Sequence, residues 1–73
     1  MEIRSDITGT VIEIVAPVGT SVRQGDAVVK LESMKMEILL TAPRSGKIVE
    51  MRVGEGDAVK EDAVFAVMEP DAG

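Results

Sequence analysis

The residues Leu31-Glu32-Ser33-Met34-Lys35-Met36-Glu37-Ile38 lie almost at the midpoint of a chain of 73 residues, and one sequence pattern runs on both sides of them. A shift of 37 positions, from Gly9 to Gly46, places Gly9–Glu32 on Gly46–Glu69 without a gap. Eight aligned pairs are apolar in both copies, and five further pairs are identical: Gly9/Gly46, Glu13/Glu50, Gly19/Gly56, Val22/Val59 and Glu32/Glu69. Such self-similarity indicates an internal duplication.

Lys35 lies in the short join between the two copies, and the same shift takes it to Ala72 near the C-terminus. Two copies related by an approximate two-fold axis would place the join at one end of the molecule and both termini at the other. We therefore expect a single domain over 1–70 and a C-terminal tail over 71–73. Within the domain, copy one covers about 1–33, a hairpin covers 33–37 and copy two covers about 38–69.

The composition describes a small domain that must build its core without cross-links. The chain has no cysteine and no histidine, which excludes disulfides, thiolate metal sites and an imidazole general base. We expect no catalytic residue and no metal ligand. Eleven valines and six isoleucines favour strands, because β-branched side chains fit a pleated sheet.

The charge and the hydropathy pattern exclude other classes of partner. A net charge of −5 without a basic cluster argues against nucleic-acid binding. No apolar run approaches the ~20 residues that cross a bilayer, so we expect no membrane insertion. The N-terminal residues lack the apolar stretch of a signal peptide. These features predict a cytoplasmic protein.

Alternation of apolar and polar residues predicts the strands and their inner faces. Both copies have a first alternating strand, Gly9–Ala16 and its counterpart from Gly46, with its acidic residue facing solvent. A later strand over Ala27–Ser33 alternates in the same way, and Ile38–Ala42 follows the join until Pro43. On this pattern the inward residues are Ile12, Ile14, Ala16, Ala27, Val29, Leu31, Ile38, Leu40, Ala42, Val49, Met51, Val53, Val64, Ala66 and Met68, and the outward ones are Val11, Val15, Val28, Ile48 and Arg52.

Short strands separated by glycine, with no sustained helical period, predict an all-β fold. We expect a flattened barrel or sandwich of two four-stranded antiparallel sheets with an internal pseudo-two-fold repeat. Each sheet takes strands from both copies. One copy alone has too little apolar surface to offset the entropy of ordering its chain.

Lys35 has three possible roles at the join. The simplest is a solvated surface charge, with Met34 and Met36 as packing residues. A catalytic amine is disfavoured, because such a group needs burial or a neighbouring cation, whereas Glu32 and Glu37 stabilise the ammonium form. The third role is an attachment point. It is favoured because methionines flank the lysine where a bare turn prefers Asn, Asp or Gly, and because methionine is common on recognition surfaces.

At these residues the chain resembles a known family. Glu32-Ser33-Met34-Lys35-Met36-Glu37 is similar to the biotin attachment motif, Ala/Ser-Met-Lys-Met, of biotinyl carrier domains. The resemblance covers nearly the whole chain, including the duplication, Gly46-Lys47-Ile48 and Glu55-Gly56-Asp57-Ala58-Val59 with its relative in the first copy. It implies the biotinyl/lipoyl type of fold and a non-catalytic carrier component.

The resemblance also implies a site, a cofactor and partners. Lys35 would carry biotin after a biotin protein ligase delivers it from biotinyl-adenylate. Met34 and Met36 would serve recognition, with Ser33, Glu32 and Glu37 flanking the site. The tethered biotin would move as a swinging arm between a biotin carboxylase and a carboxyltransferase, as in carboxylases, decarboxylases or transcarboxylases.

Two other functions remain open from the sequence. A lipoyl carrier domain of an oxo-acid dehydrogenase-type complex is one, since a Glu-Ser pair before the lysine also occurs in lipoyl domains. An unmodified β-sandwich interaction module is the other, although such a module would tolerate any residue at position 35.

Overall fold

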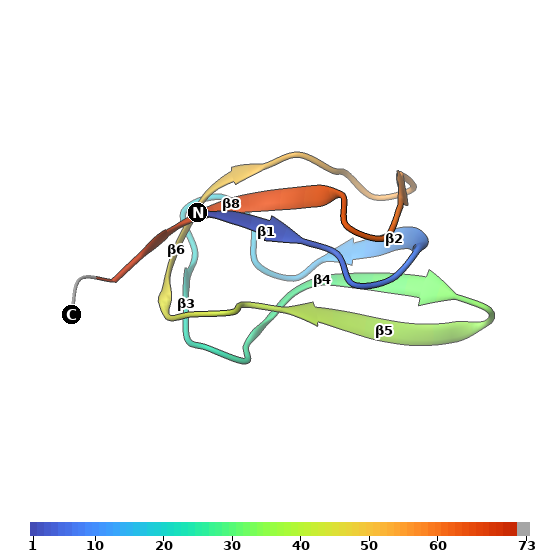
Figure 1. Cartoon of the computed structure of the whole chain (residues 1–73), viewed down its shortest axis with the longest axis horizontal. Helices are drawn as coiled ribbons and strands as arrows, with labels where there is room; N and C mark the ends of the chain where they lie inside the picture. Colours follow the sequence, from blue (N-terminus) through green and yellow to red (C-terminus); the bar gives the residue numbers. More distant parts are fainter. Residues whose placement is uncertain (72–73) are drawn as a thin grey trace.

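A computed structural model describes residues 1–71, and β-strands are the regular elements of that range. The end of the predicted tail, residues 72 and 73, lies outside the described residues, and with it Ala72, the counterpart of Lys35. The strands (Figure 1) are β1 (Glu2–Arg4), β2 (Gly9–Ile14), β3 (Ser21–Val22), β4 (Ala27–Ser33), β5 (Met36–Thr41), β6 (Gly46–Met51), β7 (Ala58–Val59) and β8 (Val64–Pro70).

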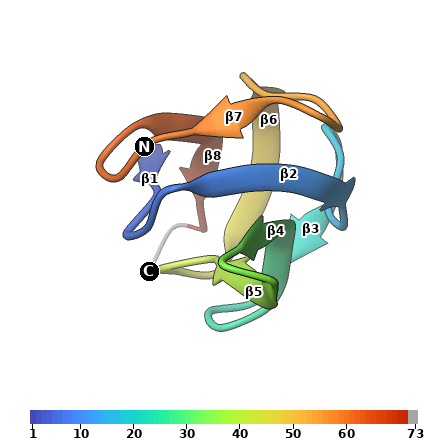
Figure 2. The ribbon, with the colours of Figure 1, turned by 90° about the vertical axis from the view of Figure 1, so that its right-hand side faces the viewer.

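The strands form two antiparallel four-stranded sheets, in the orders β1-β8-β6-β3 and β5-β4-β2-β7. Each sheet contains strands from both halves of the sequence, so the predicted fold class and the exchange of strands between the copies are confirmed. Figure 2 shows this arrangement from the end that carries the β4–β5 hairpin.

Hydrogen bonds between the copies repeat at the offset seen in the sequence. Val11 N–H donates to the Asp57 carbonyl at 2.8 Å, and its counterpart Ile48 N–H donates to the Thr20 carbonyl at 2.9 Å. These bonds lie beside the β2–β7 and β3–β6 pairings, each of which joins one strand from each half. The duplication is therefore a property of the three-dimensional structure and not of the sequence alone.

One apolar core fills the space between the sheets. Its members come from both halves in matched positions, such as Leu31 with Met68 and Val28 with Phe65. Packing the two short sheets against each other removes apolar side chains from water. This burial is the main favourable contribution to the free energy of folding. The core comprises Ile3, Val11, Ala16, Val22, Val28, Val29, Leu31, Leu40, Ala42, Ile48, Val59, Phe65, Ala66 and Met68.

The predicted alternation is wrong at the start of the first strand of each copy, whereas the later inward positions pack in or against the core, at Ile14 and Ala16 in one copy and at Met51 and Val53 in the other. Val11 and Ile48 were expected outside but are buried, while Val49, expected inside, is exposed and Ile12 is half-buried. The cause is a β-bulge: the register shifts between Val11 and Glu13 in β2 and between Ile48 and Glu50 in β6. An extra residue reverses the inside–outside pattern across it, which a period of two cannot anticipate.

The later strands contain the same irregularity. Val28 was expected to face solvent but is fully buried, because the register of β4 against β5 shifts between Ala27 and Val29. Its counterpart Phe65 is also buried, where the pairing of β8 with β1 shifts. The other inward predictions for β4, for β5 and for Ala42 just after it hold at Val29, Leu31, Leu40 and Ala42, which are buried. Ala27 and Ile38, also expected inside, are half-buried.

Gly9 and Gly46, which begin β2 and β6, are an identical pair of the repeat, and the structure explains why both are glycine. A Cβ on Gly9 would lie 2.8 Å from the Glu32 carbonyl oxygen. A Cβ on Gly46 would collide with the carbonyl of Glu69, the counterpart of Glu32, and lie 2.8 Å from the Pro70 Cα. Only glycine allows these strands to approach so closely.

The molecule is elongated, 38 × 18 × 18 Å along its principal axes. The β4–β5 hairpin forms one end, and the N-terminus and the end of β8 lie toward the other (Figure 1). No element described in residues 1–71 is a helix that could cross a membrane.

Gly46→Ala tests the close approach of β6 to β8. The added methyl should lower the free energy of unfolding by about 1 to 3 kcal/mol, as overpacking does. Gly54→Ala is the matched control, because its nearest neighbour would be Asp57 Oδ2 at 3.8 Å, an ordinary contact. Urea denaturation followed by circular dichroism measures both variants. If both substitutions changed the free energy of unfolding equally, the close approach of β6 to β8 would not be the reason for glycine at position 46.

Candidate functional site

The predicted hairpin exists, and its two-residue loop is Met34-Lys35. Ser33 pairs with Met36 at the end of the ladder, and the loop residues have φ angles of 52° and 65°. Positive φ at both central positions is the signature of a type I′ hairpin turn, which prefers Asn-Gly. Each left-handed residue that is not glycine costs of the order of 1 to 3 kcal/mol. The loop sequence is therefore not the one that stability alone favours.

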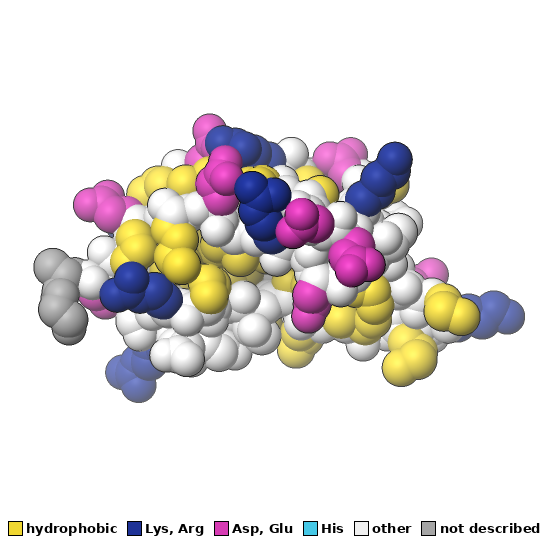
Figure 3. Space-filling model, in the orientation of Figure 1, with side chains coloured by type: hydrophobic (Ala, Val, Ile, Leu, Met, Phe, Trp, Pro, Cys, Tyr) yellow, Lys and Arg dark blue, Asp and Glu magenta, His cyan; other side chains and the backbone are white. Residues whose placement is uncertain are grey.

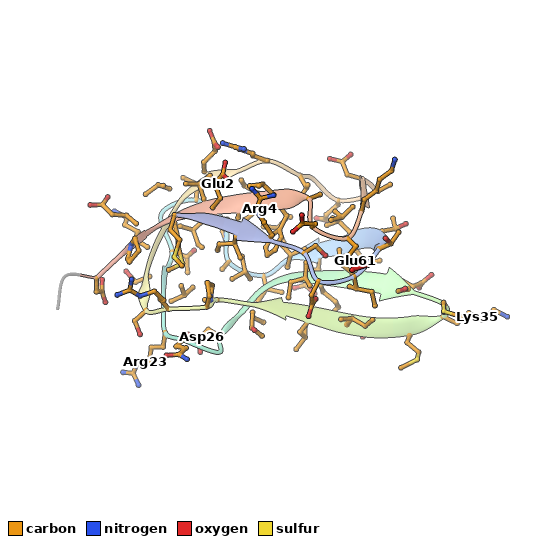
Figure 4. All side chains as sticks on the ribbon, viewed as in Figure 1. Glu2, Arg4, Arg23, Asp26, Lys35 and Glu61 are labelled. Atoms are coloured by element: carbon orange, nitrogen blue, oxygen red, sulfur yellow. The ribbon has the colours of Figure 1, made fainter. Side chains whose placement is uncertain are left out.

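Lys35 lies at the outermost tip of the molecule (Figure 4). Its side chain is exposed and forms no ion pair or hydrogen bond with any other residue of the described range 1–71. In space-filling view, apolar side chains stand beside the basic one at this end (Figure 3). The amine is sterically open on a short, defined support.

The two flanking methionines are among the exposed apolar side chains of the protein. Met34 is 92% exposed and Met36 is 64% exposed, whereas Met68 in the core is fully buried. The interpretation of Met34 and Met36 as packing residues is therefore wrong. Two large apolar groups are held in water on either side of one lysine, which is an arrangement typical of a recognition surface.

Acidic side chains lie on the strands directly behind the tip. Glu32 and Glu37 are opposite each other across β4 and β5, an unfavourable pairing of like charges. Lys30 lies two pairs further back, and its ammonium is 3.7 Å from Glu37 and 3.6 Å from Glu13. Ser33 is half-buried. The ammonium of Lys30 is thus engaged with carboxylates on the sheet, unlike that of Lys35.

The base of the hairpin is fixed by packing. Leu31 is fully buried, and its cross-strand partner Ile38 is half-buried. Gly9 brings β2 against the Glu32 carbonyl, as described above. Sequence reasoning did not single out Gly9 as a support for the site, although its identity with Gly46 was a signal. The hairpin therefore projects from a rigid body.

The remaining charge network lies on the other sheet, away from the tip. Arg52 contacts Glu50 at 2.6 Å and Glu2 at 3.4 Å, and the hydrogen bond and charge of Glu50 raise the pKa of the Arg52 guanidinium above its usual value. Among residues 1–71 no group of three or more acidic side chains is placed to hold a metal ion.

The functional groups at the hairpin tip are few. Residues 33–37 contain one amine, one hydroxyl, one carboxylate and two thioethers.

The fold and the hairpin together define a carrier domain of the biotinyl/lipoyl class. A family model described as "Biotin-requiring enzyme" matches residues 8–68. The chain belongs to this family and is a biotin carboxyl carrier domain.

Relatives of two kinds support this placement. The chain is 36% identical over 67 residues to a "Biotinylated protein TB7.3 homolog" from Mycobacterium leprae, covering 92% of this chain and 94% of that protein. It is 40% identical over 58 residues to the pyruvate carboxylase of Aspergillus niger, covering 80% of this chain but 5% of the enzyme.

A solved structure agrees with the sequence relatives. The urea carboxylase of Kluyveromyces lactis superposes with a TM-score of 0.89 at 35% identity, covering 94% of this chain and 6% of that one. The chain is thus similar to a whole small protein and to a small part of large carboxylases.

Replacing the loop tests whether its sequence is a compromise with stability. Met34→Asn combined with Lys35→Gly introduces the residues that a type I′ turn prefers and should raise the free energy of unfolding by about 1 to 3 kcal/mol. Urea denaturation measures the change against the parent protein. A double variant that is less stable than the parent would contradict the assignment of strain to this loop.

Proposed function

We propose that Lys35 is the residue that carries biotin, and that the chain acts as a non-catalytic carrier. The observation that carries the proposal is the position of Lys35: an exposed amine at the tip of a strained two-residue turn, between two exposed methionines. A surface lysine of no function would not need this turn. An attachment point needs its amine displayed to the active site of another enzyme.

The residues present fit this cofactor. Biotin is joined through its carboxyl group, so the protein must offer a primary amine that can form an amide. Lys35 Nζ is free of partners within residues 1–71, whereas Lys30 is held by Glu13 and Glu37. Lys47 in β6 and Lys60 after β7 are exposed, but neither stands at a hairpin tip between methionines.

When bound, biotin supplies a ureido nitrogen that accepts and releases a carboxyl group. The chain contributes the tether and its anchor. A tether replaces free diffusion by a high effective concentration at each enzyme that the arm can reach. The rigid base of the hairpin confines that arm to one end of a rod 38 Å long. The rest of the domain is then free for docking.

The proposed partners are a biotin protein ligase, a biotin carboxylase and a carboxyltransferase. Met34 and Met36 would provide the apolar contacts that these enzymes recognise, and Ser33, Glu32 and Glu37 would border them. The likeness to domains within pyruvate and urea carboxylases supports the last two partners. A cytoplasmic location remains a prediction from the sequence.

A lipoyl carrier is the weaker candidate. The relatives described above are carboxylases and a biotinylated protein, and methionine occupies both positions beside the lysine. An unmodified interaction module is disfavoured by the strain of the loop, which such a module would have no reason to keep.

Lys35→Arg tests the attachment site directly. The substitution keeps the positive charge but removes the primary amine, so biotin incorporation should vanish while the melting temperature hardly changes. The parent and the variant are co-expressed with a biotin protein ligase, and the intact mass is measured. The parent should gain the mass of one biotinyl group, and peptide mapping should place it on Lys35.

Matched controls separate the alternatives. Lys30→Arg, Lys47→Arg and Lys60→Arg should each load as the parent does. Co-expression with a lipoate ligase should leave the parent unmodified. Biotin in good yield on the Lys35→Arg variant, or lipoyl in place of biotin on the parent, would refute the proposal.

A further inference from the structure

The five methionines of the chain differ widely in access to solvent. Met34 is 92% exposed, Met36 64% and Met1 48%, whereas Met51 is half-buried and Met68 is fully buried. The two most exposed ones therefore flank Lys35 at the hairpin tip. The chain also has no cysteine, so no thiolate on it competes for an oxidant.

An exposed thioether reacts with a peroxide by a two-electron step. A sulfur lone pair attacks one peroxide oxygen, the S–O bond forms and the O–O bond breaks. Hydrogen peroxide leaves its other oxygen as water after proton transfer, so the sulfur is oxidised and the peroxide is reduced. The product, methionine sulfoxide, is polar, and methionine sulfoxide reductases return it to the thioether.

The geometry prevents the hairpin from protecting these sulfurs. Met34 has a positive φ at the centre of the turn, and Met36 opens the edge strand β5. Both flank Lys35, which lies at the tip of the molecule (Figure 4). Apolar side chains are visible at this end in the space-filling view (Figure 3). The same exposure that suits them for recognition leaves them open to oxidation.

We propose that Met34 and Met36 are a reversible oxidation site that controls loading of Lys35. Peroxide converts the apolar flanks of the lysine into polar sulfoxides, and the ligase then recognises the hairpin poorly. The core is untouched, because Met68 lies inside it. The inference rests on the proposed function, since it adds a regulation to the same site.

The first test follows the order of oxidation in the intact, unloaded protein. Dilute hydrogen peroxide is added, and peptide mapping by mass spectrometry follows each methionine. Met34 and Met36 should be oxidised first, with Met68 last. Circular dichroism should show an unchanged fold and melting temperature while only the flanking methionines carry oxygen.

The second test measures the initial rate of biotin incorporation by a biotin protein ligase, with peroxide removed beforehand. The oxidised protein should load about tenfold more slowly than the untreated sample, equivalent to about 1.4 kcal/mol of lost recognition. Treatment with methionine sulfoxide reductases should restore the rate. An untreated sample that loads normally shows that the proposed function holds independently of this inference.

Substitutions locate the effect. In the double variant Met34→Leu with Met36→Leu, peroxide treatment should leave the initial rate of biotin incorporation unchanged. This holds whatever the rate of the untreated double variant is. The control Met51→Leu should keep the sensitivity of the parent. Loading that is unaffected by sulfoxide at both positions would overturn the proposal. Sensitivity that persists in the double variant, or that appears only when Met68 oxidises and the fold is lost, would overturn it as well.

Discussion

The pairing of strands between the two halves of the chain is the constraint on which the rest of the structure depends. β2 from the first half pairs with β7 from the second, and β3 from the first pairs with β6 from the second. The hydrogen bonds beside these pairings repeat in both halves at 2.8 to 2.9 Å. Neither half contains a complete sheet, so the core between the sheets forms only when both are present.

This exchange of strands also leaves one element free to carry a function. The loops at the two ends of the rod are related by the duplication, but the join between the copies has no repeated counterpart within residues 1–71. The β4–β5 ladder extends over Ala27–Thr41 and continues to the tip, where Met34 and Lys35 take left-handed conformations. A body held together from both sides can support a strained turn, because the ladder behind the turn fixes its geometry.

The sequence predicted the duplication, the two sheets and the hairpin at the join, because these follow from a repeat of positions and from the placement of glycine. It did not predict the burial of Val11, Val28 and Ile48, which lie at or beside bulges. The bulges at Ile12 and Val49 insert a residue on one strand only, and the alternation of residue types carries no mark of them. The positive φ angles at Met34 and Lys35 were likewise invisible, since neither residue favours them. The exposure of both methionines was inferred from their position beside Lys35 at the join, and the structure supports it.

The most direct test of this account is the folding of one half on its own. A fragment of residues 1–33 contains β1 to β4 but lacks the partners of β1, β2 and β3 that lie in the second half. Circular dichroism with thermal melting should show it unfolded, with no cooperative transition, while the whole chain melts cooperatively. A cooperative, β-rich fragment would contradict the claim that exchanged strands hold this domain together.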